Sequence, residues 1–258
     1  NTASETTRPG RLFMNKTIVL IGTYNESENL AAIAGEILAL RAGLDILVID
    51  DNSPDGTGRV ADALAAAHPE VSVIHRPGKL GLGTAYVAGF RRALERGYER
   101  VITMDADFSH HPRYLPGILR ALETNDVVVG SRYTKGGGVE NWPRHRILLS
   151  RGGSVYARLV TGMPSSDATG GFNGYRREVL EGIGIDSIRS EGYSFQVEMK
   201  FRSWKKGYRI AEIPIVFADR TRGKSKMSKR IFLEAVFMLW KIRFADRAAP
   251  QTPPPHGG

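Results

Sequence analysis

The chain has 258 residues, of which 41% are hydrophobic and 24% are charged, enough for one large globular domain or two small ones. The absence of cysteine excludes disulfides, thiolate zinc sites and a cysteine nucleophile. A formal charge of +9 favours an anionic partner, such as nucleic acid, nucleotide phosphates or an anionic membrane surface. No uncharged apolar run is as long as the roughly 18 residues that a transmembrane helix needs.

The composition divides the chain into four stretches. Residues 1–13 lack the apolar centre of a signal peptide and are predicted to be a flexible leader. Residues 14–227 carry the alternating segments of a folded domain, and residues 228–245 are predicted to form an amphipathic helix at a membrane interface. The proline-rich residues 246–258 are predicted to be disordered.

The first half of the domain alternates between short apolar runs and segments with helical spacing. This alternation predicts an α/β fold with a mainly parallel central sheet, flanked by helices on both faces. Strands are predicted at residues 16–22, 45–50, 71–75, 101–104 and 126–130, and helices at residues 30–40, 57–67, 84–95 and 113–123.

The second half is less regular. Three glycines at 136–138 predict a mobile loop, and a late apolar run at 210–217 contains a proline that suits an edge strand. The remaining segments are helices at 148–161 and 195–206, a loop at 164–171, and a short strand and helix within 172–182.

Acidic residues follow two of the predicted strands. Asp105 and Asp107 come after the strand at 101–104, and the strand at 45–50 ends on Asp50, which Asp51 follows. Carboxyl ends of parallel strands meet at one sheet edge, where open α/β sheets bind ligands. Two close carboxylates repel each other unless a cation lies beside them, and hard oxygen ligands suit Mg²⁺ or Mn²⁺. The alternative is that Asp105 and Asp107 only cap a helix or solvate a loop.

A nucleoside diphosphate fits such an edge. Asp51 can accept hydrogen bonds from ribose or base, and Tyr24 can pack on the base, although a rim aromatic is an equal interpretation. Glu26 could be only an acid at the start of a helix. The glycines at 78–83 match neither the dinucleotide fingerprint nor a Walker loop, and they indicate a tight turn with Lys79 as a possible phosphate neighbour.

Eight motifs in order carry a family resemblance. They are T-Y-N-E at 23–26, D-D-N-S-P-D-G-T at 50–57, G-L-G-T-A at 81–85, M-D-A-D at 104–107, G-S-R-Y at 130–133, G-G-G-V at 136–139, N-W-P at 141–143 and G-K-S-K-M-S at 223–228. Between residues 18 and 244 the chain resembles the polyprenol-phosphate (dolichol-phosphate) mannose synthases. These belong to glycosyltransferase family 2, with the Rossmann-like GT-A fold.

The resemblance implies a reaction. Mannose would pass from GDP-mannose to a polyprenyl phosphate with inversion, in a metal-dependent enzyme that uses Mg²⁺ or Mn²⁺. The alternative within the fold is a UDP-sugar donor, carrying glucose or N-acetylglucosamine, with a polyprenyl phosphate or another acceptor. The enzyme would lie peripherally on the cytoplasmic face of a membrane, with a membrane-anchoring partner subunit as a possible addition.

The resemblance also assigns roles by motif. The predicted catalytic residues are Asp105, Asp107 and Arg132, and the predicted metal ligands are Asp105, Asp107 and Ser109. The predicted nucleotide-sugar contacts are Gly22, Tyr24, Glu26, Ile49, Asp51, Asp105, Ala106, Arg132, Arg220 and Lys226. Two residues depart from the family pattern: Gly22 stands where proline is usual, and Ser109 stands where some members have a glutamine ligand. His110 and His111 are expected to shape the turn.

The acceptor chemistry needs cations more than a base. A phosphate monoester has a second pKa of about 6, so it arrives as a nucleophile and no general base is required. The site must hold two polyanions together, and the metal, several arginines and a lysine could supply the positive charge. Each of these basic side chains could instead be a solvated surface charge. The candidates are Arg132, Arg144, Arg146, Arg220, Arg222 and Lys226. Replacement of Arg132 by alanine is expected to abolish transfer and to leave the fold intact.

Two further segments bear on the acceptor and the membrane. The loop from Gly136 to Arg146 could close over the donor, and Trp142 could pack on the donor or touch lipid. The apolar segment from Ser228 to Phe244, with basic ends, suits a membrane interface, although a packing helix is the alternative. No helix-turn-helix, RRM or zinc signature supports a nucleic-acid partner, and the intact acidic residues argue against a non-catalytic nucleotide-binding subunit.

Overall fold

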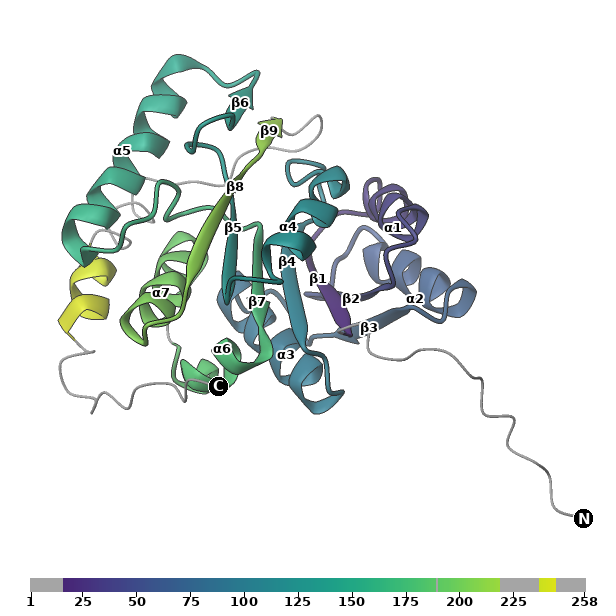
Figure 1. Ribbon diagram of the computed structural model, residues 1–258. Helices are drawn as coiled ribbons and strands as arrows, with labels where there is room; N and C mark the ends of the chain where they lie inside the picture. The colour runs from purple at the N-terminus through teal and green to yellow at the C-terminus, as the bar shows by residue number, and fades with distance from the viewer. Residues whose placement is uncertain (1–15, 189, 219–236, 245–258) are drawn as a thin grey trace, which may run out of the picture.

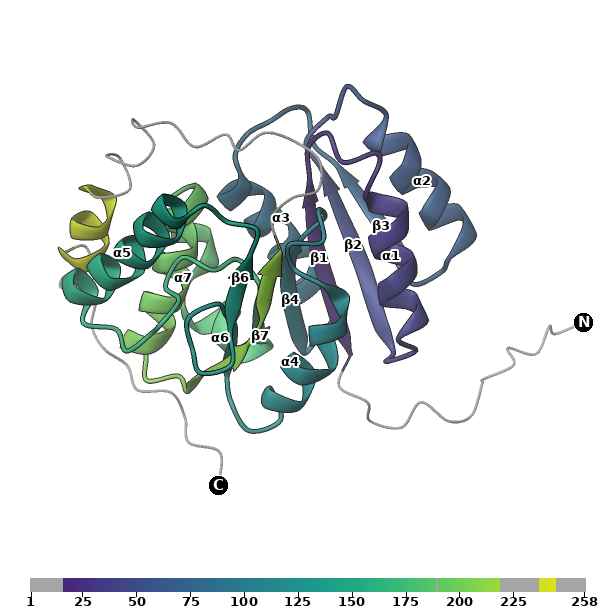
Figure 2. The ribbon, with the colours of Figure 1, turned by 90° about the horizontal axis from the view of Figure 1, so that it is seen from above.

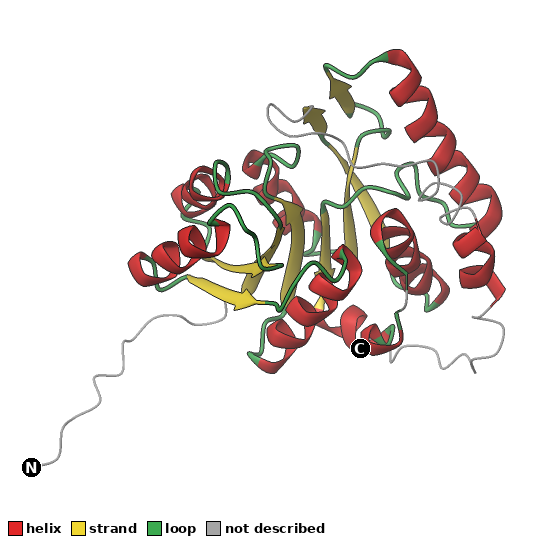
Figure 3. Cartoon of the chain, turned by 180° about the vertical axis from the view of Figure 1, so that it is seen from behind, coloured by secondary structure: helices red, strands yellow, loops and turns green. Residues whose placement is uncertain are grey.

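The computed structural model describes residues 16–188, 190–218 and 237–244. Their centre is a seven-stranded sheet in the order β3-β2-β1-β4-β7-β5-β8, which runs through the middle of the molecule in Figures 1 and 3. The strands are β1 (Thr17–Thr23), β2 (Leu44–Asp50), β3 (Val71–His75), β4 (Arg100–Asp105), β5 (Val127–Ser131), β7 (Asn173–Arg176) and β8 (Ile210–Pro214).

The sheet is mainly parallel, as predicted. Strands β1, β2, β3 and β4 pair in parallel, and so do β5 and β8. Strand β7 is antiparallel to both of its neighbours, β4 and β5. The strands of the parallel half are nearly continuous apolar runs because helices cover both faces of this sheet.

Helices form a layer on each face of the sheet, as seen from above in Figure 2. One layer packs under β1 and β2 through Tyr86 and Phe90, and the opposite layer does so through Leu30 and Ile33. The first layer contains α3 (Leu82–Glu95), α6 (Arg177–Gly182) and α7 (Gly192–Lys205), and the second contains α1 (Leu30–Ala39), α2 (Thr57–Ala67) and α4 (Leu115–Ala121).

Helix α5 (Arg144–Thr161) lies outside these two layers and packs on α7 rather than on the sheet. Residues 237–244 are helical and join the same small core, to which they contribute Leu239 and Ile242. Short 3₁₀ turns occur at Pro112–Tyr114 and Ile185–Ser187. Of the helices in the described ranges, none combines the length and the apolar character that crossing a bilayer requires.

The second half departs from its predicted elements at three points. The expected mobile loop at 136–138 leads into a short strand, β6 (Gly138–Glu140), which pairs in parallel with β9 (Val216–Ala218). The predicted strand at 210–217 is therefore two strands, because the chain leaves the large sheet after Pro214. Helix α5 begins at Arg144, four residues before its predicted start, directly after Pro143, whose fixed φ suits a helix entry.

Several predictions concern residues outside the described ranges. These are the leader at 1–13, the boundary between the domain at 14–227 and the helix at 228–245, and the tail at 246–258. Arg220, Arg222 and Lys226 also fall outside the described residues.

Candidate active site

The ends of three neighbouring strands bring predicted site residues together. Gly22 in β1 lies in register between Ile49 of β2 and Asp105 of β4. Thr23 is opposite Asp50, and its hydroxyl lies 3.3 Å from the Asp50 carboxylate. The parallel pairing therefore places the T-Y-N-E loop and both acidic strand ends side by side.

The D-D-N-S-P-D-G-T turn braces the loop after β1. The Ser53 hydroxyl donates to Asp50 Oδ1 at 2.5 Å, and Ser53 Oγ accepts the backbone N–H of Asn25 at 3.1 Å. The Thr57 hydroxyl accepts the N–H of Glu26 at 2.9 Å. Asp50 and the hydroxyl residues of this motif therefore position the loop, which the sequence alone did not reveal.

Asp55 takes part in the same brace. Its carboxylate accepts the N–H and hydroxyl of Thr57, at 3.0 and 2.6 Å, and the N–H of Ser27 at 3.1 Å. Partial burial raises the pKa of Asp55, but these hydrogen bonds outweigh it and lower the pKa to about 2. The carboxylate is therefore charged at neutral pH and holds the loop through charge-assisted bonds.

Asp51 is buried and paired with an arginine that the sequence did not single out. Arg76 donates to Asp51 Oδ1 at 2.6 Å, and its other terminal nitrogen donates to the Thr84 hydroxyl at 2.6 Å. Burial raises the pKa of Asp51, and the positive charge of Arg76 opposes that rise. Arg76 comes directly after β3, at the same sheet edge as Asp51, and this position was the signal that could have identified it.

The glycine loop meets the T-Y-N-E loop. The Lys79 ammonium lies 4.2 Å from the centre of the Tyr24 ring, so the two form a cation–π contact. Gly81 precedes α3 with φ of 100°, a conformation that L side chains rarely adopt, so the entry into α3 favours glycine at this position. The Glu26 carboxylate accepts the side-chain amide N–H of Asn29 at 2.9 Å, so Glu26 lies beside the start of α1.

The predicted metal residues form a compact turn after β4. Asp107 Oδ1 accepts the N–H of Ser109 at 3.1 Å and its hydroxyl at 2.5 Å. Asp107, Ser109 and Ala106 are buried, whereas the Asp105 side chain is 31% exposed. Asp107 and Ser109 are thus joined by hydrogen bonds, and Asp105 ends β4 two residues before Asp107.

His110 and His111 shape this turn, as expected. The backbone N–H of Asp105 donates to His110 Nδ1 at 2.9 Å, so this nitrogen is the unprotonated one. Burial lowers the pKa of His110, which keeps its ring neutral. The ring stacks on Phe172 with centroids 5.1 Å apart, and His111 accepts the N–H of Arg113.

The donor set fits a hard divalent cation. Within the described ranges, no three His, Asp or Glu side chains converge on one point as a closed metal cage. Two carboxylates at a sheet edge are nevertheless what Mg²⁺ commonly uses, because substrate phosphates and waters complete its octahedral shell. The residues present therefore suit a metal that is held together with a diphosphate.

Arg132 is held in a buried ion pair. Its Nε donates to Asp167 Oδ2 at 2.7 Å, and one terminal nitrogen donates to Asp167 Oδ1 at 2.6 Å. Arg132 is 6% exposed and Asp167 is fully buried. Burial penalises both charges, but the pairing outweighs it, raising the pKa of Arg132 and lowering that of Asp167. Because the guanidinium is already paired with Asp167, a contact between Arg132 and a substrate phosphate stays a prediction.

Lys200 and Glu212 fix the loop that carries Asp167. The fully buried Lys200 ammonium donates to the carbonyls of Ala168 and Gly170, at 3.1 and 2.6 Å. Burial lowers the pKa of Lys200 to about 7, although the Asp167 charge opposes this. Glu212 accepts the hydroxyl of Ser165 at 2.8 Å. Sequence reasoning missed these residues because their burial depends on how α7 and β8 pack.

Aromatic rings surround the other side of Arg132. Its guanidinium carbon lies 5.2 Å from the Tyr133 ring centre and 5.4 Å from that of Phe217. Trp142 contacts Phe217 edge-on, with centroids 5.4 Å apart, and Arg146 lies 3.9 Å over the Trp142 ring. The N-W-P turn is thus packed onto β9. Arg144, at the start of α5, is exposed.

Known proteins are similar to this chain over most of its length. The model of the family "Glycosyl transferase family 2" matches residues 18–184. The chain is 48% identical over 232 residues to the undecaprenyl-phosphate mannosyltransferase of Micrococcus luteus, covering 90% of this chain and 96% of the relative. It is 46% identical to the polyprenol monophosphomannose synthase of Mycolicibacterium smegmatis, covering 88% of each.

Solved structures share the fold at low identity. The glucosyl-3-phosphoglycerate synthase of Mycobacterium tuberculosis, in complex with phosphoglyceric acid, has a TM-score of 0.68 at 17% identity, over 89% of this chain and 80% of its own. A mannosyltransferase of Pyrobaculum calidifontis, in complex with GDP-mannose and Mn²⁺, has a TM-score of 0.58 at 19% identity, over 98% of this chain and 70% of its own. These similarities, with the mostly parallel sheet, give the chain the GT-A fold. The chain is therefore a glycosyltransferase that belongs to glycosyl transferase family 2, and within that family it is similar to the polyprenyl-phosphate mannosyltransferases.

Proposed function

We propose that this enzyme transfers mannose from GDP-mannose to a polyprenyl phosphate, with inversion at the anomeric carbon. The observation that carries the proposal is the register that brings Gly22, Ile49 and Asp105 side by side, with Asp51 and Asp107 in the adjoining turns. The two mannosyltransferase relatives, similar over nearly the whole chain, support the sugar and the acceptor class. A UDP-sugar donor is the alternative that a donor panel would test.

The donor nucleoside would lie between the loops after β1, β2 and β3. The Tyr24 ring and Lys79, which contact each other, would form one side, and the buried pair of Asp51 and Arg76 would form the other. Asp51 keeps carboxylate oxygens that can accept hydrogen bonds from base or ribose, while Arg76 orients it. Glu26 and the edge at Gly22 and Ile49 complete the proposed nucleoside contacts.

The diphosphate would lie over the turn after β4. Asp105, Asp107 and Ser109 are the proposed ligands of Mg²⁺ or Mn²⁺, with Ala106 between them. When bound, the metal would neutralise the diphosphate and stabilise the departing nucleotide as a Lewis acid. The Ser109 hydroxyl already donates to Asp107 at 2.5 Å, so we assign Ser109 chiefly to orienting that carboxylate.

The acceptor needs no base from the protein. Its phosphate is largely ionised near neutral pH and can attack the anomeric carbon directly. We assign Arg132 to this side because its guanidinium lies at the end of β5 and faces the rings of Trp142 and Phe217. Arg220 and Lys226 remain proposed phosphate contacts. A lipid acceptor places the enzyme at a membrane surface, which we propose to be the cytoplasmic face, with or without an anchoring partner subunit.

A transfer assay tests this function. The full chain is incubated with labelled GDP-mannose and a short, water-soluble isoprenyl phosphate, with and without a chelator. We expect transfer that needs the metal and that falls at least about a hundredfold in Asp107→Asn, since a metal contributes several kcal/mol to such a reaction.

Asp62→Asn is the matched control, because Asp62 is an exposed carboxylate on α2. Undiminished transfer in Asp107→Asn would refute the metal role. Faster transfer from UDP-glucose than from GDP-mannose would refute the donor.

A further inference from the structure

Exposed apolar side chains are concentrated at one end of the molecule. Of ten large hydrophobic side chains that are exposed in the described residues, seven lie on α5 or on helix 237–244. Scattered surface leucines are normal, but a contiguous group marks an interaction site. We call this group the α5 ridge, and it consists of Leu148, Leu149, Val155, Leu159, Phe237, Trp240 and Phe244.

Helix α5 has apolar side chains on two faces, one buried and one exposed. Its inner face, with Ala157 and Val160, is buried against α7. Leu148, Val155 and Leu159 recur at helical spacing on the outer face, and Leu148 and Leu159 are 75% and 74% exposed. The protein core therefore does not explain the outer face.

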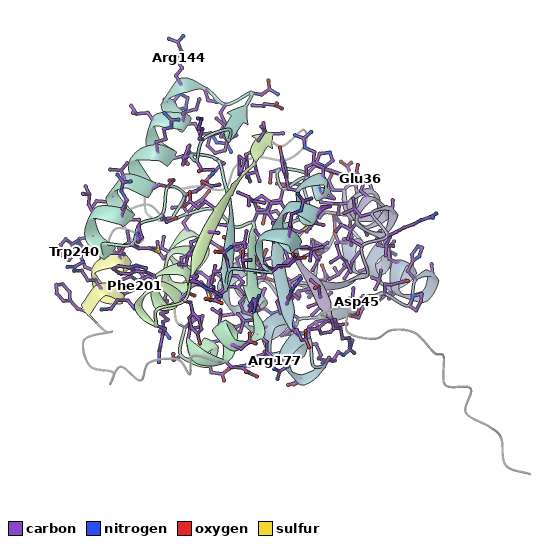
Figure 4. All side chains as sticks on the ribbon, in the orientation of Figure 1. Glu36, Asp45, Arg144, Arg177, Phe201 and Trp240 are labelled. Carbon is purple, nitrogen blue, oxygen red and sulfur yellow. The ribbon has the colours of Figure 1, made fainter. Side chains whose placement is uncertain are left out.

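Helix 237–244 continues the same surface. Its inner residues, Leu239 and Ile242, are buried, whereas Phe237 is 69% exposed and Trp240 is 44% exposed. The Trp240 indole N–H donates to the Tyr156 hydroxyl at 2.9 Å, which ties this helix to α5. Figure 4 shows Trp240 at the outer edge of the molecule, beside α5.

The charges on the two helices of the ridge are all of one sign. Neither residues 144–161 nor residues 237–244 contain aspartate or glutamate. Arg144, Arg151 and Arg158 are exposed and recur every seven residues, so they form a stripe beside the apolar one. Lys241 on the other helix is also exposed. Two copies meeting through this face would bring these cations together, which disfavours a dimer.

We propose that the α5 ridge is the surface on which this enzyme docks to an anionic phospholipid bilayer. Apolar side chains flanked by arginine, with a tryptophan at the margin, are suited to the boundary between headgroups and acyl chains. This extends the membrane role predicted for residues 228–245 to α5, whose amino-acid pattern first suggested an ordinary helix.

The α5 ridge lies near the side of the site that we assign to the acceptor, and this step rests on the proposed function. Helix α5 begins just after Trp142, and the Tyr133 hydroxyl donates to Ser150 Oγ on α5 at 2.7 Å. Figure 1 shows the start of α5 beside β6 and β9. A docked ridge would thus hold the Arg132 segment next to the headgroups, where the phosphate of a membrane lipid emerges.

Vesicle flotation tests the docking without any substrate. The full chain is mixed with phosphatidylcholine vesicles, with or without phosphatidylglycerol, and the floated fraction is measured. We expect Leu148→Gln/Leu159→Gln to weaken binding at least about tenfold, because each leucine loses apolar burial. Arg151→Glu/Arg158→Glu should weaken binding to the anionic vesicles about 30-fold or more, since each basic residue contributes about 1 kcal/mol.

Two control variants match these changes. Leu148→Met/Leu159→Met keeps the apolar surface and should float like the wild type. Arg41→Glu/Arg59→Glu makes the same charge change on exposed arginines near α1 and α2, at the far end of the sheet in Figure 1, and should retain most binding. Circular dichroism checks that every variant is folded.

The outcomes separate docking from catalysis. Unchanged flotation of both ridge variants would overturn the proposal. So would a concentration-dependent dimer, seen by sedimentation, that Leu148→Gln/Leu159→Gln abolishes while flotation is unchanged. Loss of flotation with normal transfer to the short isoprenyl phosphate would support docking. Wild-type enzyme that floats but transfers no mannose would refute the proposed reaction and leave the bilayer contact standing.

Discussion

Replacing Arg132 by alanine tests the buried ion pair at the end of β5. In the wild type, Arg132 donates two side-chain bonds and one backbone bond to Asp167, at 2.7, 2.6 and 3.0 Å. The variant would leave the Asp167 carboxylate fully buried without its principal partner. The sequence-based expectation, that this variant loses only transfer, is therefore replaced by an expected loss of stability as well.

The size of the loss follows from burial. Breaking one side of a buried ion pair costs about 3–5 kcal/mol, and a domain of ordinary stability has only about 5–15 kcal/mol in total. The Lys200 ammonium remains in the same buried cluster, which argues for the lower end, near 3 kcal/mol. A loss of this size would remove a large part of the free energy of unfolding.

Urea unfolding followed by circular dichroism measures this loss. Arg92→Ala is the matched control, because Arg92 is an exposed arginine whose contact with Glu95, at 3.7 Å, contributes little. A double variant, Arg132→Met/Asp167→Asn, removes both charges and should regain part of the lost stability. A loss below about 1 kcal/mol in Arg132→Ala would refute the assignment of a buried pair.

Three further predictions concern packing and pH. Gly152→Ala in α5 should stabilise by about 0.5–1 kcal/mol, since an added Cβ meets nothing within 4 Å and alanine favours the helix. Gly89→Ala in α3 should instead destabilise by about 1 kcal/mol, because its Cβ would lie 2.6 Å from Ile49 Cδ1; equal effects in urea melts would contradict the packing of α3. The folded pKa of His110 lies below its usual 6.5, so between these values the unfolded chain binds the extra proton and stability falls as pH decreases. Urea midpoints at pH of about 7.5 and 5.5 should show this fall in the wild type and a smaller one in His110→Gln, and identical slopes would count against a buried neutral imidazole.

The sequence by itself determined most of the secondary-structure elements and the sheet edge at which the candidate site lies. Continuous apolar runs and helical spacing predicted the parallel strands and their helices, since both signals depend on local side-chain periodicity. Because the carboxyl ends of parallel strands share an edge, the clustering of Asp51, Asp105 and the loop at Glu26 followed from chain order alone. The motifs then indicated the family, which the comparisons confirm.

Long-range packing decided the rest. Whether an arginine is free or paired depends on which carboxylate the fold brings to it, and Asp167 lies 35 residues from Arg132. The pairing of Asp51 with Arg76 and the burial of Lys200 share this non-local origin. The pairing of β6 with β9 does too, because neither short strand has a pattern that specifies its partner. Helix α5 shows the same division: its sequence has the amphipathic spacing, but only its packing on α7 shows which apolar face stays exposed.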